Sequence, residues 1–397
     1  MKLPFWSRIR KARQGKLDEA TPVGLGETED FRVGTEGTAE ETQWRLIWLR
    51  FRRHKLAMGG ATIVLLFYLV ALLAEFLAPF DPLRYDSRYP YAPPHRLRLI
   101  ETTPDGSRLN LHVLAFDVEL DTVRLLRHFV PNPDRVIDVR FFVRTEPYRL
   151  FGVIPMRRRL IGPVDRDEHM FLLGADRLGR DLLSRLIYGT RISMTVGLVG
   201  VALSLVLGVL LGGISGYFGG WVDNLIQRLI EFLQSIPSIP LWLGLSAAIP
   251  PRIDPLLVYF YITIILSVLG WTGLARVVRG RFMSLKTEDF VVAARLDGCS
   301  SMRIINRHMV PSFTSHIIAT TTLAIPHMII GETSLSFLGL GLRPPVISWG
   351  VLLQQAQNVR TIATAPWLML PGVAVAIAVL ALNFFGDGLR DAADPYA

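Results

Sequence analysis

The 397-residue sequence lacks the motifs on which common catalytic and metal sites depend. Its single cysteine, Cys299, excludes an internal disulfide and any zinc site built on cysteine pairs. It contains no Gly-x4-Gly-Lys-Ser/Thr phosphate loop, no His-Glu-x2-His pair and no Gly-x-Ser-x-Gly nucleophile turn. We therefore expect a chain that is not an enzyme and that holds neither a cofactor nor a metal.

The composition favours a membrane protein. Apolar residues make up 50% of the chain, which is too much for a soluble protein of this length, and the formal charge is +9. The basic residues cluster beside apolar segments, as they do where they orient membrane helices. The charge thus points to the lipid bilayer and not to nucleic acid.

Six apolar runs are candidates for spanning helices, which need about 20 residues each. They are residues 56–79, 192–214, 225–248, 256–274, 317–330 and 367–385. Six spans place both termini on one side, and the loop between the fourth and fifth spans lies on that side too. We expect this side to be cytoplasmic because the loop is strongly basic, with Arg276, Arg279, Arg281, Lys286, Arg295, Arg303 and Arg307.

Two segments outside the spans have distinct compositions. Residues 1–55 are polar and are expected to form a largely flexible cytoplasmic segment, with an amphipathic surface helix at 44–53. Residues 80–170 fall on the outer side and are expected to fold as a small β-rich insert. Alternating runs predict strands at 98–102, 109–120 and 135–145, and Thr103-Pro104-Asp105-Gly106-Ser107 has the residues of a tight turn.

Residues 171–191 are expected to be an amphipathic lead-in, 192–386 a five-helix domain and 387–397 a cytoplasmic tail. Small residues at helical spacing in the second span predict a close helix contact, at Ser193, Gly197, Ser204, Gly208, Gly212 and Gly216. The third span contains two prolines, and a broken helix at membrane depth either kinks or lines a wet cavity. The candidate pathway residues are Ser235, Pro237, Ser238 and Pro240.

Carboxylates are scarce inside the apolar runs. Glu231 lies close to Arg228, so we expect a local ion pair, and Glu332 is expected at the outer end of the fifth span in contact with water. His308 and His316 have no carboxylate at ligand spacing and are interpreted as structural. A proton-coupled secondary transporter would need several carboxylates near the middle of the membrane. Their absence argues against that class.

The basic loop contains the most informative stretch, residues 289–311. It predicts two short helices joined at Gly298, since glycine tolerates the positive φ of such a turn. Ala293 and Ala294 would make a low face on which another protein could rest, and Pro311 suits the first turn of the next helix. The expected docking residues are Asp289, Val292, Ala293, Ala294, Arg295, Asp297, Gly298, Cys299 and Arg303.

This stretch resembles the coupling motif of binding-protein-dependent ABC importers, which reads Glu-Ala-Ala, three residues, Gly, nine residues, Ile-x-Leu-Pro. Ala293, Ala294, Gly298 and Pro311 match in register, whereas Val292 replaces the usual Glu. Further motifs, in family order, resemble the second permease of peptide/nickel systems. They are Leu173–Asp181, Arg185–Ser193, Gly216–Asp223, Ser334–Gly341, Ser348–Gly350, Ala365–Trp367 and Gly386–Asp391.

The resemblance implies an all-α polytopic permease of type I ABC importers in a bacterial inner membrane, with both termini cytoplasmic. It also implies the partners: a homologous second permease, two cytoplasmic ATPase subunits that hydrolyse ATP, and an extracytoplasmic substrate-binding protein. Oligopeptides or dipeptides are the expected substrates, and similar permeases carry nickel or oligosaccharides. The rivals from other classes are a secondary transporter or channel, and a receptor or scaffold built on the 80–170 insert.

Overall fold

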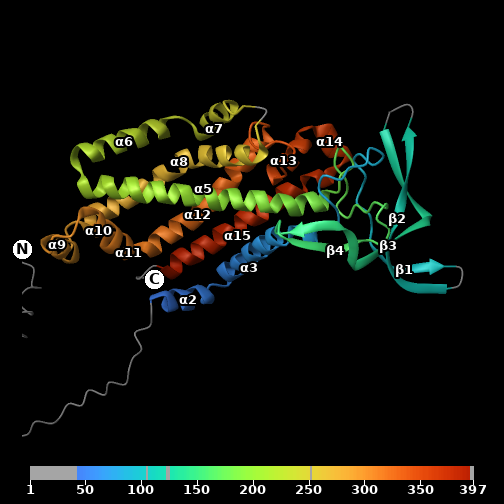
Figure 1. Ribbon diagram of the computed structural model, residues 1–397, viewed down its shortest axis with the longest axis horizontal. Coiled ribbons are helices and arrows are strands. Elements are labelled where there is room, and N and C mark those ends of the chain that lie inside the picture. The colour runs from blue at the N-terminus through green and yellow to red at the C-terminus, as the bar shows by residue number, and fades with distance from the viewer. Residues whose placement is uncertain (1–42, 104–105, 122–125, 251–252, 394–397) are drawn as a thin grey trace, which may run out of the picture. The chain divides into compact units, whose positions relative to one another are not determined.

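The computed structural model describes residues 43–103, 106–121, 126–250 and 253–393. These residues form a bundle of long helices with a four-stranded sheet at one end (Figure 1). The helices are α2 (Gln43–Arg53), α3 (Lys55–Leu72), α4 (Ala74–Leu77), α5 (Leu182–Phe218), α6 (Gly220–Ser235), α7 (Ser238–Ala247), α8 (Pro255–Leu285), α9 (Asp289–Leu296), α10 (Ser301–Ile304), α11 (Val310–Ser312), α12 (Thr314–Phe337), α13 (Trp349–Gln354), α14 (Val359–Thr364) and α15 (Leu370–Ala393). A π-helical turn, η1, covers Ile305–Met309, and 3₁₀ turns cover Gln355–Gln357 (η2) and Pro366–Met369 (η3).

Four helices in the described part are long and apolar enough to cross a membrane: α3, α5, α8 and the joined η3 and α15. A fifth is counted if residues 301–312 and α12, bent by 75° at a short break, form one span. The predicted third span, 225–248, is instead divided between α6 and α7, because Pro237 lacks an N–H and disfavours a helical Ile236 before it. Pro240 lies within the first turn of α7 and does not break it. The count of six spans stays a prediction.

Helix ends also differ from the predicted spans. The first span ends as a helix at Leu72 and continues as the short α4. The second begins at Leu182, so the end of the expected lead-in belongs to α5. The Asp181 side chain caps this helix by accepting a hydrogen bond from the Ser184 N–H. The fifth and sixth extend to Phe337 and Ala393, past their apolar runs. Apolar runs mark only the lipid-level part of a helix, whereas packing and caps decide its ends.

The stripe of small residues brings α5 and α8 into close contact, as predicted. A methyl group on Gly212 would overlap the backbone of Ala275, and one on Gly216 would lie 2.6 Å from Cβ of Phe282. Such contacts let two apolar helices pack by van der Waals attraction at short range. A second cluster unites α3, α5, α12, α13 and α15 around the fully buried Trp349.

The sheet has the order β1-β2-β3-β4, and each pair of neighbours is antiparallel. Its strands are β1 (Arg98–Thr103), β2 (Gly106–Asp121), β3 (Leu126–Leu150) and β4 (Ile154–Pro163). The three predicted strands are confirmed, and the pairing of Thr103 with Gly106 closes the first hairpin, although Pro104 and Asp105 lie outside the described residues. Strand β4 was missed, because its run of arginines hides the alternation.

The sheet is attached to the bundle by buried polar contacts. Arg159 of β4 donates to the carbonyl of Ala78 after α4 (2.9 Å), and the N–H of Phe80 donates to Oγ of Ser184 in α5 (3.0 Å). Buried Val113 and Ile137 of the sheet pack with Phe80 and Met170. The sheet is therefore joined to the ends of two candidate spans.

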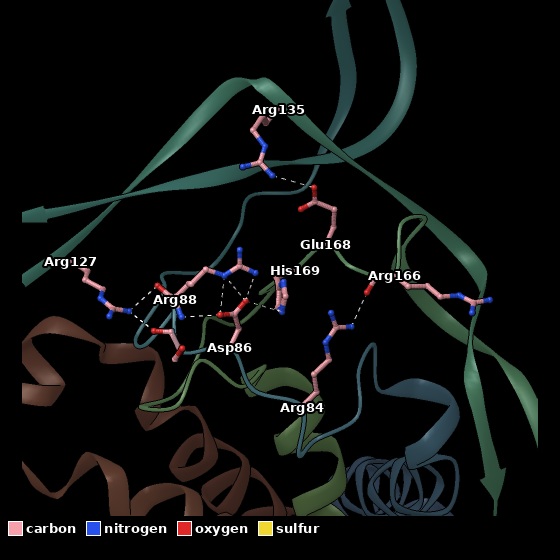
Figure 2. A network of polar contacts seen from close by, with 9 residues as sticks. Arg84, Asp86, Arg88, Arg127, Arg135, Arg166, Glu168 and His169 are labelled. Atoms are coloured by element: carbon pink, nitrogen blue, oxygen red, sulfur yellow. Dashed lines mark hydrogen bonds and ion pairs between the residues drawn. The ribbon is translucent and has the colours of Figure 1, made fainter.

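A network of polar contacts joins the segment before β1 to the segment after β4 (Figure 2). Asp86 pairs with Arg88 (2.7 Å) and faces His169 (3.6 Å), and Arg135 pairs with Glu168 (3.3 Å). Hydrogen bonds from Arg88 hold the pKa of the Asp86 carboxyl below its usual value. The segments before β1 and after β4 are thus tied together beneath the strands.

Candidate functional site

The predicted coupling stretch forms a separate helical element at the end of the bundle far from the sheet (Figure 1). Helix α9 ends at Leu296, Gly298 turns the chain with φ +75°, and α10 begins at Ser301. Pro311 lies in the first turn of α11. The prediction of short helices joined at Gly298 is confirmed.

One face of this element packs into the bundle. Val291 and Ile304 are fully buried and Ala294 is 6% exposed, in a cluster that includes Phe282 of α8. The expectation that both alanines offer a docking face is therefore wrong for Ala294. The helical period of 3.6 residues puts Ala294 three positions after the buried Val291, on the same side of α9.

The opposite face is open. Of the predicted residues, Asp289, Val292, Ala293, Arg295, Asp297, Gly298 and Arg303 are exposed and Cys299 is partly buried. Three large apolar side chains that were not predicted join them: Phe290 (41% exposed), Leu296 (83%) and Met302 (48%). We call Phe290, Val292, Ala293, Leu296 and Met302 the docking face, after the role that the sequence predicts for this stretch. The burial of Val291 and Ile304 determines which side chains of α9 and α10 remain exposed. The sequence motif alone does not show this.

Residues of the Gly216–Asp223 motif pack against the buried side of the same element. Asp223 forms a bidentate ion pair with Arg279 (2.5 and 2.6 Å), which joins α6 to α8, and it accepts a hydrogen bond from Oγ of Ser215 (2.5 Å), which joins α6 to α5. Buried Tyr217 packs in the cluster with Val291, and the guanidinium of Arg295 lies 5.9 Å from its ring centre. The docking face therefore rests on three long helices and not on a loose loop.

The predicted pathway residues gather at the break between α6 and α7. Ser235, Pro237, Ser238 and Pro240 are all exposed in the chain by itself. The neighbouring face of α6 is apolar and exposed as well, with Leu225, Leu229 and Phe232 at 58%, 47% and 63%. Arg228 and Glu231 form the expected local ion pair at 2.8 Å.

The expectation that Glu332 is solvated is wrong, because its side chain is fully buried. Its Oε1 accepts hydrogen bonds from Ser336 (2.8 Å) and Ser348 (2.7 Å), and its Oε2 lies 3.4 Å from Oγ of Ser193. The hydroxyl of Ser193 in turn accepts from the N–H of Trp349 (3.0 Å). Three motifs that are far apart in the sequence meet at this carboxylate, and its hydrogen bonds compensate for burial.

Two further motifs meet at the sheet end of the bundle. Gly174, with φ +82°, packs directly on the Trp367 ring, whose Nε1–H donates to the carbonyl of Ala175 (2.9 Å). Asp176 is fully buried and accepts from Nε of Arg180 (2.7 Å). These residues join the chain before α5 to η3, just before α15.

The fold and this arrangement are those of a polytopic helical protein with several helices long and apolar enough to cross a membrane. Residues 208–396 match the family described as "Binding-protein-dependent transport system inner membrane component", and residues 42–94 match the "N-terminal TM domain of oligopeptide transport permease C". The chain belongs to this family of multi-pass inner-membrane permease subunits of ABC importers.

Several curated relatives are similar over most of the chain. The di/tripeptide transport system permease protein DppC of Pseudomonas aeruginosa is 30% identical, covering 88% of this chain and 90% of the relative. The oligopeptide transport system permease protein OppC of Bacillus subtilis is 31% identical, covering 89% of each. A structure of the methionine ABC transporter MetNI in an inward-facing conformation is 18% identical with a TM-score of 0.42, covering 53% of this chain and 96% of that chain.

Proposed function

We propose that this permease subunit carries oligopeptides or dipeptides into the cell. The support is that the relatives similar over nearly their whole length are named for peptide transport. The alternative with the same architecture is import of nickel complexes or oligosaccharides. A secondary transporter is disfavoured, because in the described helices the buried Glu332 is bonded by serines and Glu231 is paired with Arg228.

We propose that ATP hydrolysis in two partner ATPase subunits is coupled to this chain through the docking face. The observation that carries this proposal is the two-sided character of α9 and α10, with apolar side chains exposed on one side and a packed cluster on the other. A push on Leu296 would be transmitted through Val291 to α8, since closely packed side chains resist compression. The expected polar contact of the family's Glu is replaced here by an apolar one at Val292.

We propose that α6 and α7 together make the third span, broken at Pro237 beside the translocation pathway, which brings the number of spans to six. Backbone freed at such a break is stable at membrane depth where protein or a wet cavity surrounds it. The exposed apolar face of α6 would be covered by the homologous second permease. The proposed domain limits are 1–55, 56–79, 80–170, 171–191, 192–386 and 387–397, as predicted above.

The proposed topology has the docking face and both termini in the cytoplasm and the sheet outside, where an external binding protein would deliver the substrate. It is supported by the position of α9 and the sheet at opposite ends of the long helices (Figure 1). Single cysteines test it in a Cys299→Ser background. Leu109→Cys lies on β2, where Leu109 is 87% exposed, and Leu296→Cys lies on the docking face.

In intact cells, an impermeant thiol reagent should label Leu109→Cys and not Leu296→Cys. With a cysteine-bearing ATPase subunit, Leu296→Cys should cross-link and Leu109→Cys should not. Labelling of Leu296→Cys from outside would refute the topology, and failure of its cross-link across a set of ATPase positions would refute the docking proposal.

Substrate class is tested with the assembled transporter and its binding protein in proteoliposomes. Labelled di- and oligopeptides should accumulate with ATP, whereas nickel chelates and oligosaccharides should neither accumulate nor compete. Accumulation of one of these in place of peptides would refute the peptide assignment and leave the coupling proposal standing.

A further inference from the structure

The hairpin of β3 and β4 places like charges against each other. Arg144 of β3 is directly opposite Arg158 of β4 in the antiparallel register. Side chains in such pairs have Cβ atoms about 5 Å apart, and two like charges there are destabilising. Neither guanidinium forms an ion pair within the part of the chain that the structure describes. Both side chains are exposed, so an anion from outside the chain could reach them and reduce this repulsion.

The two arginines border an open cleft of about 510 Å³. Its lining consists of Arg144, Thr145, Met156, Arg157, Arg158 and Arg166, without a carboxylate. The carbonyl of Arg166 accepts a hydrogen bond from Arg84 (2.9 Å), and the carbonyl of Arg158 accepts one from the hydroxyl of Tyr148 (2.5 Å). Figure 2 shows the Arg166 side chain turned away from the network around Asp86.

A second cleft of about 570 Å³ adjoins the first and shares Arg144, Thr145 and Arg166 with it. It contains carboxylates, at Asp81, Glu146 and Asp167. None of these carboxylates forms an ion pair with the arginines in the described residues. Acidic side chains of the chain thus lie in the adjoining cleft, and the cleft with the paired arginines has none in its lining.

The hairpin lies beside the end of the first span. Phe142, which has φ +56° and is 58% exposed, is 6.1 Å from Phe76 of α4 between ring centres. At the hairpin tip, Phe151, Val153 and Ile154 are 43%, 77% and 50% exposed. Exposed aromatic and aliphatic side chains next to arginines, at the end of a spanning helix, match the interface between lipid tails and headgroups.

We propose that the arginine cleft binds the phosphate of an anionic phospholipid in the leaflet next to the sheet. Arg guanidinium groups bind phosphate through paired, charge-assisted hydrogen bonds, and the apolar tip would lie among the acyl chains. The bound lipid would offset the repulsion between Arg144 and Arg158 and hold the sheet against the membrane. The site does not depend on the substrate, and only the identity of the leaflet rests on the proposed topology.

The test uses the assembled transporter in a neutral detergent, with native mass spectrometry during titration of phosphatidylglycerol or phosphatidylcholine. Arg144→Gln/Arg157→Gln/Arg158→Gln removes three charges from the cleft. Each basic side chain near a membrane surface contributes about a factor of five to anionic-lipid binding, so the triple variant should bind phosphatidylglycerol about a hundredfold more weakly. Phosphatidylcholine binding should be unchanged.

Two controls separate the site from net charge and from folding. Replacement of the exposed Arg96, Arg98 and Arg140 by Gln removes the same charge from the same region of the chain, and phosphatidylglycerol binding should stay within about twofold. Replacement of the three cleft arginines by Lys keeps the charge and should retain most of the binding.

Equal losses in the cleft variant and the Arg96/Arg98/Arg140 variant would overturn the proposal in favour of general electrostatic attraction. Full displacement of the lipid by inorganic phosphate would identify a free-anion site. Unchanged lipid binding, with weaker binding of the external binding protein, would make the cleft a protein contact. All three readings are independent of whether peptides are transported.

Discussion

Adjacent alanines in α9 should respond in opposite ways to the same substitution. Ala293 is exposed on the docking face, so Ala293→Glu should change the free energy of unfolding by no more than about 0.5 kcal/mol. Ala294 is 6% exposed and packs in the cluster with Phe282. A carboxylate buried there without a partner should cost roughly 3–5 kcal/mol, enough to detach α9 from the bundle.

The two variants are compared in purified permease by thermal unfolding and in the assembled transporter by ATPase binding. Ala293→Glu should unfold like the wild type but bind the ATPase subunit about thirtyfold more weakly, because a charge buried at the interface costs at least about 2 kcal/mol. Ala294→Glu should lower the unfolding temperature itself. Equal stability of both variants would refute the assignment of the packed face, and normal ATPase binding by Ala293→Glu would refute the docking face.

Three other predictions follow from single positions. Gly298→Ala should lower the free energy of unfolding by about 1 kcal/mol because of the positive φ alone, since a Cβ at this position would have no atom within 4 Å. Gly298→Val, with a β-branched side chain, should distort the turn more and weaken the coupling of ATP hydrolysis to transport. Normal substrate-stimulated ATPase activity in Gly298→Val would contradict this. Cysteines at Ser235 and Ser238, in the Cys299→Ser background, should react with small polar thiol reagents, because the break between α6 and α7 is proposed to face the translocation pathway. Protection of both cysteines in the resting and the ATP-trapped states would refute this and identify the break as a kink without contact to the pathway. Burial lowers the pKa of His95 from 6.5 to about 4. Between these pH values the unfolded chain binds a proton at His95 and the folded chain does not, so the free energy of unfolding should fall by about 3 kcal/mol as the pH drops from 6.5 to about 4. The pH dependence of unfolding should flatten in His95→Gln, and an unchanged slope would refute this cause.

Local signals in the sequence predicted several elements correctly. The alternation at 109–120 became part of β2, Gly298 became a turn of positive φ, and Pro237 ended a helix. Each of these depends on backbone preferences of neighbouring residues, which a sequence displays directly. The arginine-rich β4 and the ends of α5 could not be predicted in this way, because pairing and capping partners from elsewhere decide them.

The sequence by itself determined a membrane protein with apolar helices, a basic stretch with short helices at 289–311 and a β-rich segment, because composition and periodicity set how each segment meets lipid or water. Only the tertiary structure decided which side of each segment is buried and which remains exposed. It buried Ala294 and left Ala293 open, enclosed Glu332 among serines of distant motifs, and set Arg144 opposite Arg158. Those outcomes depend on contacts between residues far apart in the chain, where a shift of one residue in strand register or one position on a helix reverses which side chain faces the interior.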